Sequence, residues 1–451
     1  MRSLNKEGRM QELWGRKVLK KEIETIKNIK KKSQKLLTMQ EVSEKTIQCL
    51  RCGQIHSKNT VQLVTEHYYC PKCIQLGRVD TSQKFYYLPE PTPVKRTVHF
   101  AWDGTLTDGQ QAVSDDLLAS IKNHESRMIW AVTGAGKTEM LFKTIHYSLE
   151  CGYRVAIASP RVDVCLELFP RIHAVFPEEP AILLHGKMEE CYRYTKLLVC
   201  TTHQLLRFFH AFDVLIIDEV DAFPFVGNQL LQYGVKQAIK KNSSLVYLTA
   251  TPTKELTKKT DKNELQTSIL PARYHRRILP VPKIKWCHQW YKKIKKGNTP
   301  KALVAKIHSL VVKNDVLIFC PSISLMEQLK KAVEKKFPEV PLACVHSQDP
   351  ERLEKVLKMR NKEYRILMTS TILERGVTFD GVSVIVLGAN HPVFATSALV
   401  QIAGRVDRRM DYTAGEVWFL HDGCTKAMKE AIKQIKKMNT LGIERGLIDD
   451  M

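Results

Sequence analysis

A glycine-rich loop between an apolar run and an amphipathic run most constrains the fold of this chain. Residues 127–140 read RMIWAVTGAGKTEM. A strand, then Gly-Lys-Thr, then a helix is typical of a phosphate-binding loop, in which backbone N–H groups at the helix start face phosphate oxygens. We expect Lys137 to neutralise the β- and γ-phosphates and Thr138 to hold Mg²⁺. The residues expected to bind the nucleotide here are Thr133, Gly134, Ala135, Gly136, Lys137 and Thr138. A chance Gly-Lys-Thr turn is the alternative.

Acidic residues follow a second apolar run, VLIIDEVDAF at residues 214–223. Ligands of open α/β sheets lie at the carboxyl ends of the strands. We therefore expect Asp218 to reach the Mg²⁺ and Glu219 to orient or deprotonate the attacking water. An acidic helix cap is the alternative, and it suits Asp221 better than Asp218.

Apolar strands alternate with amphipathic helices in two blocks. In the first block the predicted strands are residues 127–132, 155–159, 197–201, 214–218 and 245–250, and helical spacing covers residues 137–150 and 227–241. In the second block the predicted strands are residues 316–322, 342–347, 365–371, 382–390 and 416–422, and helical spacing covers residues 324–337 and 425–438. Such alternation predicts parallel sheets with helices on both faces. The basic, proline-rich residues 270–284 predict a hinge between two tandem α/β domains.

Four of the 12 cysteines form the pattern C-x₂-C-x₁₇-C-x₂-C. Cys49, Cys52, Cys70 and Cys73 suit one tetrahedral Zn²⁺ with no open position, so we expect a structural metal. Two redox pairs or free thiols are the alternatives. The other eight cysteines are scattered, and several lie in apolar runs, which is typical of reduced, buried thiols.

Basic residues dominate the charge balance. The chain has 451 residues and a formal net charge of +23, which favours a polyanionic partner such as nucleic acid or a membrane surface. It has no run of about 18 apolar residues and no apolar signal core, so we expect a cytoplasmic protein. The lysine-rich start predicts a loose basic arm. The expected parts are the arm at 1–46, a four-cysteine zinc module with its linker at 47–99, and α/β domains at 100–280 and 281–451.

Further motifs give the chain a specific resemblance. DEVD at residues 218–221, TATP at 249–252 and QIAGRVDR at 401–408 follow the phosphate loop in the order found in superfamily-two helicases, which the chain therefore resembles. Alanine at position 131, where the phosphate-loop pattern has its first glycine, is common in that superfamily. The resemblance implies two RecA-like domains. It also implies that Arg405 and Arg408 face the γ-phosphate and stabilise the transition state. Two surface arginines on a helix are the alternative.

The same resemblance assigns the remaining site residues. Gln110, in LTDGQ, would hydrogen-bond the adenine edge, although neighbouring Gln111 is an alternative. Gly376 would lie near the nucleotide. The residues expected to contact nucleic-acid phosphates are Arg161, Thr202, His203 and Thr371. For Arg161 an ordinary helix-start arginine is the alternative. Contacts of this kind carry little sequence information.

Three longer matches narrow the resemblance. DEVDAFP at 218–224, LPARYH at 270–275 and FAWDGTLT at 100–107, together with the cysteine module, resemble the ComFA family of late competence proteins from Gram-positive bacteria. That family implies a DNA-dependent ATP hydrolase, a translocase that draws single-stranded DNA through a membrane channel during transformation. It also implies the channel protein and other competence proteins as partners, at the inner face of the cell membrane, with peripheral membrane association and oligomer formation. The alternatives are a replication-restart or general DNA-unwinding helicase, an RNA helicase, and a DNA-binding scaffold with a decayed motor.

Overall fold

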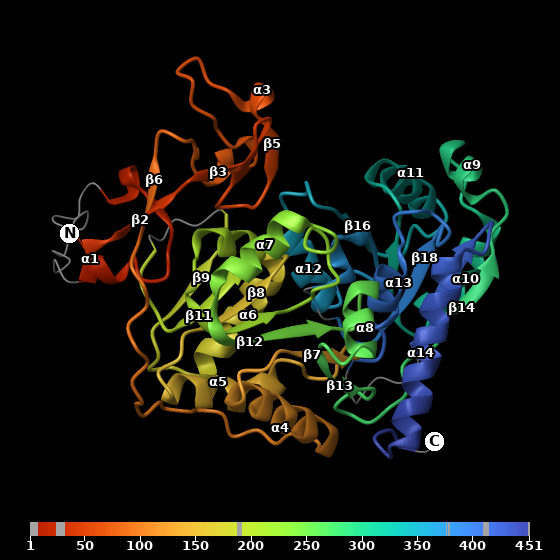
Figure 1. Ribbon diagram of the computed structural model, residues 1–451. Helices are drawn as coiled ribbons and strands as arrows, with labels where there is room; N and C mark the ends of the chain where they lie inside the picture. The colour runs from red at the N-terminus through yellow and green to blue at the C-terminus, as the bar shows by residue number, and fades with distance from the viewer. Residues whose placement is uncertain are drawn as a thin grey trace. The chain divides into compact units, whose positions relative to one another are not determined.

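The structure, a computed structural model, describes residues 8–23, 32–186, 192–375, 377, 379–408 and 415–449 (Figure 1). The chain forms two compact units. The first comprises Met1–Leu106, Gln111–Ile129 and Thr138–Ser268, and the second comprises Thr107–Gln110, Trp130–Lys137 and Ile269–Met451. Within the described ranges, no helix is both long and apolar enough to span a bilayer.

A seven-stranded sheet forms the core of the first unit. Its strands are β7 (Arg127–Ala131), β8 (Val155–Ser159), β9 (Ala181–Leu184), β10 (Leu197–Thr201), β11 (Phe212–Ile217), β12 (Ile239–Thr249) and β13 (Gln266–Leu270). They follow the order β13-β7-β12-β11-β8-β10-β9, and β9, β10, β8, β11 and β12 pair in parallel. Every side chain of β8, β10 and β11 is buried, as expected for a parallel sheet covered on both faces.

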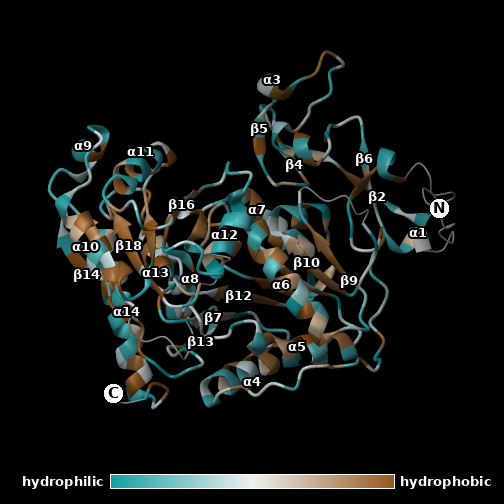
Figure 2. Ribbon diagram, turned by 180° about the vertical axis from the view of Figure 1, so that it is seen from behind, coloured by the Kyte–Doolittle hydropathy of each residue, from teal (hydrophilic) through white to brown (hydrophobic). Residues whose placement is uncertain are grey.

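Helices cover both faces of this sheet. They are α4 (Asp108–Lys122), α5 (Glu139–Glu150), α6 (Val162–Val175), η3 (Thr202–Arg207), α7 (Gln229–Ala238) and α8 (Lys254–Asp261). In Figure 1, α4 and α5 lie below the strands and α7 lies above them. Figure 2 shows strands that are mainly hydrophobic and helices that carry both hydrophobic and hydrophilic residues. Helix α7 begins at Asn228, whose side chain caps the N–H groups of Leu230 and Leu231, satisfying donors that have no partner inside the helix.

A second parallel sheet forms the core of the second unit. Its strands are β14 (Lys283–Trp286), β15 (Asp315–Phe319), β16 (Leu342–Val345), β17 (Ile366–Thr369), β18 (Val382–Leu387) and β19 (Val417–His421). They follow the order β14-β19-β18-β15-β17-β16, and each neighbouring pair is parallel. Its helices are α9 (Trp290–Lys295), α10 (Lys301–Val311), α11 (Ile323–Glu334), α12 (Arg352–Arg360), η4 (Thr371–Glu374), α13 (Thr396–Ala403) and α14 (Lys426–Glu444). The two parallel sheets confirm the predicted fold class.

Two small antiparallel sheets precede the first large sheet. The elements of this N-terminal region are α1 (Gly8–Gln11), β1 (Val18–Leu19), η1 (Lys20–Ile23), β2 (Gln34–Leu37), β3 (Met39–Ser43), β4 (Thr46–Cys49), β5 (Ile55–Ser57), α3 (Lys58–Val61), η2 (Pro71–Leu76) and β6 (Lys84–Tyr87). The sheets have the orders β1-β6-β2 and β3-β4-β5. The loose arm expected over the lysine-rich start is therefore wrong for its described residues. Leu19 and Met39 pack into the same core as the four cysteines, which stabilises strands too short to stand alone.

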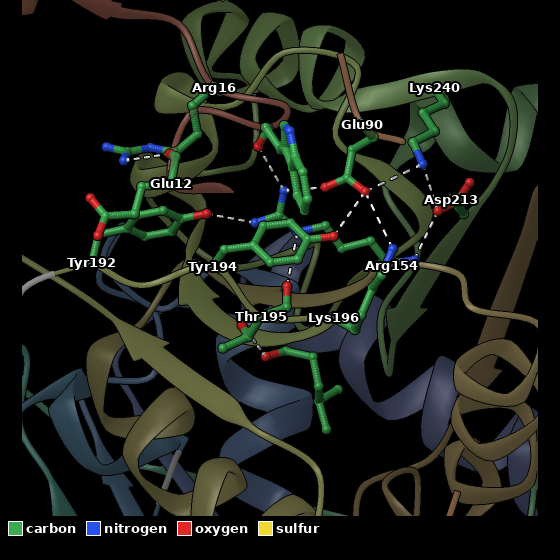
Figure 3. Close-up of polar contacts among 12 residues, drawn as sticks. Glu12, Arg16, Glu90, Arg154, Tyr192, Tyr194, Thr195, Lys196, Asp213 and Lys240 are labelled. Carbon is green, nitrogen blue, oxygen red and sulfur yellow. Dashed lines mark hydrogen bonds and ion pairs between the residues drawn. The ribbon is translucent and has the colours of Figure 1, made fainter. Parts of the chain in front are cut away.

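The N-terminal region is joined to the first large sheet through a buried arginine (Figure 3). Arg154 precedes β8, and its Nη1 lies 2.8 Å from Oε1 of Glu90, with both side chains almost fully buried. Its guanidinium also donates to the carbonyls of Trp14 and Thr195 and to the hydroxyl of Tyr192. Burial opposes the charge, but Tyr192 and Glu90 outweigh it and raise the pKa of Arg154. A single charged group thus connects residue 14 to two strands of the sheet.

Two lysines complete the surroundings of Glu90. Lys196 Nζ lies 3.4 Å and Lys240 Nζ 3.9 Å from Glu90 Oε2, and Lys240 also pairs with Asp213 at 2.8 Å. Figure 3 shows Glu90 among these cationic side chains. Because the carboxylate has several cationic neighbours, its own desolvation is compensated, whereas Arg154 depends on Glu90 for its opposite charge.

We expect Arg154→Met to lower the free energy of unfolding of the first unit by about 3–5 kcal/mol, because it breaks a buried, hydrogen-bonded ion pair. Urea denaturation followed by circular dichroism measures the change. The matched control is Lys143→Met, which removes the exposed pair with Asp115 and should cost at most about 0.5 kcal/mol. Equal effects of the two substitutions would contradict the assigned role of Arg154.

Candidate nucleotide site and metal centre

The phosphate loop has the backbone geometry that its sequence predicts. Strand β7 ends at Ala131, which is fully buried, and α5 begins at Glu139. Gly134 and Gly136 have φ angles of +80° and +74°, a left-handed conformation that residues with a side chain adopt only at a cost. Lys137 lies on the loop, with its Nζ 3.4 Å from the carbonyl oxygen of Ala131. The loop can therefore turn its N–H groups toward an anion.

Gln110 is the glutamine that faces the phosphate loop. It is buried, its Nε2 donates to the carbonyl of Ala135 at 2.8 Å, and its Oε1 accepts from the N–H of Thr107 at 2.9 Å. Gln111 instead bonds the carboxylate of Asp115 at the surface of α4. Both amide atoms of Gln110 are thus bonded to backbone groups, and the expected bond to adenine stays a prediction.

The acidic pair follows β11. The backbone N–H of Asp218 donates to the carbonyl oxygen of Ala158, in the neighbouring strand β8, at 2.8 Å. Glu219 has a φ angle of +54°, and its N–H donates to Asp218 Oδ1 at 2.9 Å. A left-handed conformation at a residue other than glycine is uncommon and clusters at functional sites. Both carboxylates therefore occupy defined positions at the carboxyl end of the strand.

Asp221 is a functional candidate that the sequence analysis missed. Its carboxylate accepts hydrogen bonds from the hydroxyls of Thr249 at 2.8 Å and Thr251 at 2.5 Å. All three residues are buried. The bonds connect DEVD to TATP, the motif that follows the parallel neighbour β12. The two threonines of TATP were the signal in the sequence for a hydrogen-bonded carboxylate. The sequence did not show which carboxylate they would contact.

The arginine motif lies in the second unit, together with residues 130–137 of the phosphate loop. Arg405 is buried, and its Nε donates to the carbonyl of Glu374, whereas Nε of Arg408 donates to the carbonyl of Gly404. A Cβ atom at Gly404 would lie 1.8 Å from Thr133 Oγ1. Only glycine fits there, so the motif touches the phosphate loop directly. Gly376 falls outside the described residues.

The four nucleic-acid candidates have different surroundings. Arg161 immediately precedes α6 and is partly exposed, and His203 in η3 is exposed. Thr371, the first residue of η4, is partly exposed and belongs to the second unit. Thr202 is fully buried, so its hydroxyl does not face solvent and cannot contact a phosphate in this conformation.

The four cysteines form one compact cluster. Their sulfur atoms all lie within 4.8 Å of one another, and every side chain is buried. The Sγ atoms of Cys49 and Cys73 are 3.8 Å apart, and those of Cys52 and Cys70 are 3.5 Å apart. Zn–S bonds of about 2.3 Å in a tetrahedron place sulfurs about 3.8 Å apart. The donor set therefore fits Zn²⁺ as a structural ion.

Without a cation, the four clustered thiols do not all ionise readily. Hydrogen bonds from Cys52 and the other two thiols lower the pKa of Cys49, whereas bonds within the same cluster raise the pKa of Cys73. Four thiolates this close repel one another without a cation between them. A bound metal ion supplies that cation.

The cysteine cluster is packed against the first large sheet's helices. Leu206 of η3 belongs to the same hydrophobic core as the cysteines, and a Cβ at Gly53 would meet the ring of Tyr233 at 2.4 Å. Lys17 Nζ bonds both the carbonyl of Leu50, beside Cys49, and Oε1 of Gln237 in α7. Loss of the metal would therefore disturb η3 and α7 as well as the cysteine loops.

Three family models match successive stretches of the chain. The family model of the competence protein ComFA N-terminal domain matches residues 3–87. The model of the type III restriction enzyme res subunit matches residues 103–254, and the helicase conserved C-terminal domain matches residues 299–410.

Two curated relatives are similar over most of their length. Competence protein ComFA of Bacillus subtilis is 43% identical over 410 residues, which cover 89% of this chain and 87% of that protein. ComFA of Streptococcus pneumoniae is 43% identical over 377 residues, which cover 82% and 86%. Among solved structures, Saccharomyces cerevisiae Dbp5 bound to RNA and ADP BeF3 has a TM-score of 0.52 at 17% identity and covers 69% of this chain and 83% of that one. This last likeness concerns the fold alone.

We expect protein purified without chelator to contain one zinc per chain, and metal removal to lower its Tm by at least about 5 °C, because metal binding is part of the folding free energy. Elemental analysis and thermal unfolding measure both quantities. Cys52→Ser should lose the metal, whereas Cys424→Ser, at an exposed cysteine outside the cluster, should keep it. Zinc-free wild-type protein of unchanged Tm would refute the site.

Proposed function

This chain belongs to the ComFA family of competence proteins, and from that premise we propose that it is an ATP-driven motor that moves single-stranded DNA during the uptake of transforming DNA. Its family and its helicase-type domains make it a helicase-like competence protein. The phosphate loop is the observation that carries the proposal: two left-handed glycines and Lys137 follow a buried strand.

In the proposed reaction each residue has a separate task. Lys137 binds the β- and γ-phosphates, the loop N–H groups bind their oxygens, and Gln110 and the glycines shape the loop. Asp218 and Thr138 would hold Mg²⁺, which neutralises charge on the phosphates when bound. Glu219 orients the attacking water, and Arg405 and Arg408 stabilise charge that develops on the γ-phosphate.

Hydrolysis would then be coupled to DNA movement through the bonded motifs. Asp221 joins DEVD to TATP through two threonine hydroxyls, so a change at the acidic pair would reach the TATP segment. The net charge of +23 supports a polyanionic substrate. Arg161, His203 and Thr371 are the proposed phosphate contacts, whereas Thr202 is buried.

In this role the protein would work at the inner face of the cell membrane beside a DNA channel and other competence proteins. A basic surface would favour peripheral attraction to anionic lipid. A DNA-unwinding helicase is the second candidate, because the helicase conserved C-terminal domain matches residues 299–410. The two functions differ in their product. A translocase hydrolyses ATP on single strands with little duplex separation, whereas the helicase separates duplexes.

We expect single-stranded DNA to stimulate ATP hydrolysis more than duplex DNA or RNA does, because phosphate contacts made along one flexible strand drive the proposed motor. Steady-state phosphate release with the three nucleic acids side by side measures this. Stronger stimulation by RNA, or efficient duplex separation in a parallel strand-displacement assay, would reject the proposed translocase.

Lys137→Ala and Glu219→Gln should each lower kcat by at least about 100-fold, because each removes a group that stabilises or orients the transition state. The control is Lys143→Met, on the exposed face of α5, whose kcat should stay within about twofold of wild type, since isolated surface pairs contribute little. Normal turnover in Lys137→Ala would show that the nucleotide site lies elsewhere.

A further inference from the structure

One arginine of the hinge segment is bonded to two of the segments assigned to nucleotide chemistry. Arg273 follows β13, in the LPARYH sequence, and is 2% exposed. Its Nε donates to the carbonyl of Thr133 in the phosphate loop at 3.1 Å. Because its guanidinium donates to backbone carbonyls, those partners explain its position.

The other end of the same guanidinium bonds the arginine motif. Nη1 donates to the carbonyls of Val406 at 2.7 Å and Asp407 at 2.5 Å, and Nη2 donates to that of Gly404 at 3.2 Å. These carbonyls flank Arg405 and immediately precede Arg408. The planar guanidinium holds its donors in a fixed fork, so the spacing between Thr133 and the motif is set by one rigid group.

Further contacts hold residues 404–408 in place beside the phosphate loop. The backbone of Gly404 lies so close to Thr133 that a Cβ would be 1.8 Å from Oγ1. His275 Nε2 lies 3.1 Å from the carbonyl of Asp407, and Asp407 itself has a φ angle of +51°. A strained residue persists only where surrounding bonds determine its conformation. The hydrogen bond from Arg273 to the carbonyl of Asp407 is one of these bonds.

The charge of Arg273 is costly at this position. Its direct hydrogen-bond partners are the four carbonyl oxygens of Thr133, Gly404, Val406 and Asp407. Burial, with the positive charge of Arg408 adding to it, lowers the pKa of Arg273 to about 9. Burying a cation among neutral oxygens adds little stability, because the free-energy cost of desolvating the charge exceeds the gain from its hydrogen bonds. Its position is better explained by what it aligns.

We propose that Arg273 is a positioning residue that holds residues 404–408 in register with the phosphate loop, so that Arg405 and Arg408 meet the nucleotide bound there. The inference rests on the proposed ATP hydrolysis. It assigns to the hinge a direct part in the reaction geometry: Arg273 touches no phosphate, yet it fixes the two groups that do.

The test compares Arg273→Lys, Arg273→Met and the control Arg276→Met. Lysine keeps the charge but loses the planar fork, and Arg276 lies in the same segment, bonded to Asp449 at the surface. The measured quantities are the Kd of a fluorescent ATP analogue, kcat and KM with single-stranded DNA, the Tm, and amide hydrogen exchange of residues 131–137 and 404–408.

We expect kcat to fall about 10- to 100-fold in both Arg273 variants, because small misplacements of catalytic groups cost this much. The Kd should change by less than about threefold, since the loop's own phosphate contacts remain. Exchange should rise in both segments. Arg276→Met should match wild type in every measurement. Because Arg273→Met can fail to fold, Arg273→Lys decides the question.

The outcomes are distinguishable. Wild-type kcat and exchange in folded Arg273→Lys would overturn the inference. So would a parallel loss of binding, turnover and Tm, which indicates a merely structural residue. Absence of hydrolysis in wild type, or normal hydrolysis in Lys137→Ala, would instead reject the proposed function. In that case the exchange of the two segments still decides whether Arg273 positions them.

Discussion

Parallel pairing of buried strands is the constraint on which the candidate site depends. Because β8, β11 and β12 run in the same direction, the loops that follow them emerge at one edge of the sheet. Asp218 can therefore bond Ala158, and Asp221 can bond Thr249 and Thr251. None of these contacts joins neighbours in sequence. They exist because strands buried on both faces satisfy their backbone N–H and C=O groups by pairing with neighbouring strands.

The opposite edge of the same sheet holds the N-terminal region. Arg154 precedes β8, Lys196 precedes β10, and Asp213 and Lys240 lie at the starts of β11 and β12. The three cationic side chains converge on Glu90, from the segment that follows the cysteine module, and Asp213 pairs with Lys240. Chemistry and attachment thus use opposite ends of the same strands, and the cysteine cluster can be integrated into the unit without occupying the edge where ligands bind.

Local patterns in the sequence predict those parts of the molecule that local physics determines. The long apolar strands, the left-handed glycines 134 and 136, and the spacing of the four cysteines could all be found in this way. What escaped prediction depends on distant partners. The four-residue strands β9 and β14 carry too little pattern, and β2 is ordered only by pairing with β6. Thr202 resembles an exposed loop hydroxyl, and only the packing of η3 buries it. Arg273 resembles any hinge arginine until its four carbonyl partners are seen.

Two of the buried arginines, Arg154 and Arg273, show how the same side chain serves different purposes. Arg154 has a carboxylate partner, and its surroundings raise its pKa, so its charge is stabilised where it lies. Arg273 is bonded to neutral carbonyls, and burial lowers its pKa to about 9. Separating Arg154 from Glu90 is costly, because it leaves the buried guanidinium without its carboxylate. When the hydrogen bonds of Arg273 open, the partners left behind are neutral carbonyls, to which water can hydrogen-bond. The first arrangement suits a permanent attachment. The second suits the positioning role proposed for Arg273.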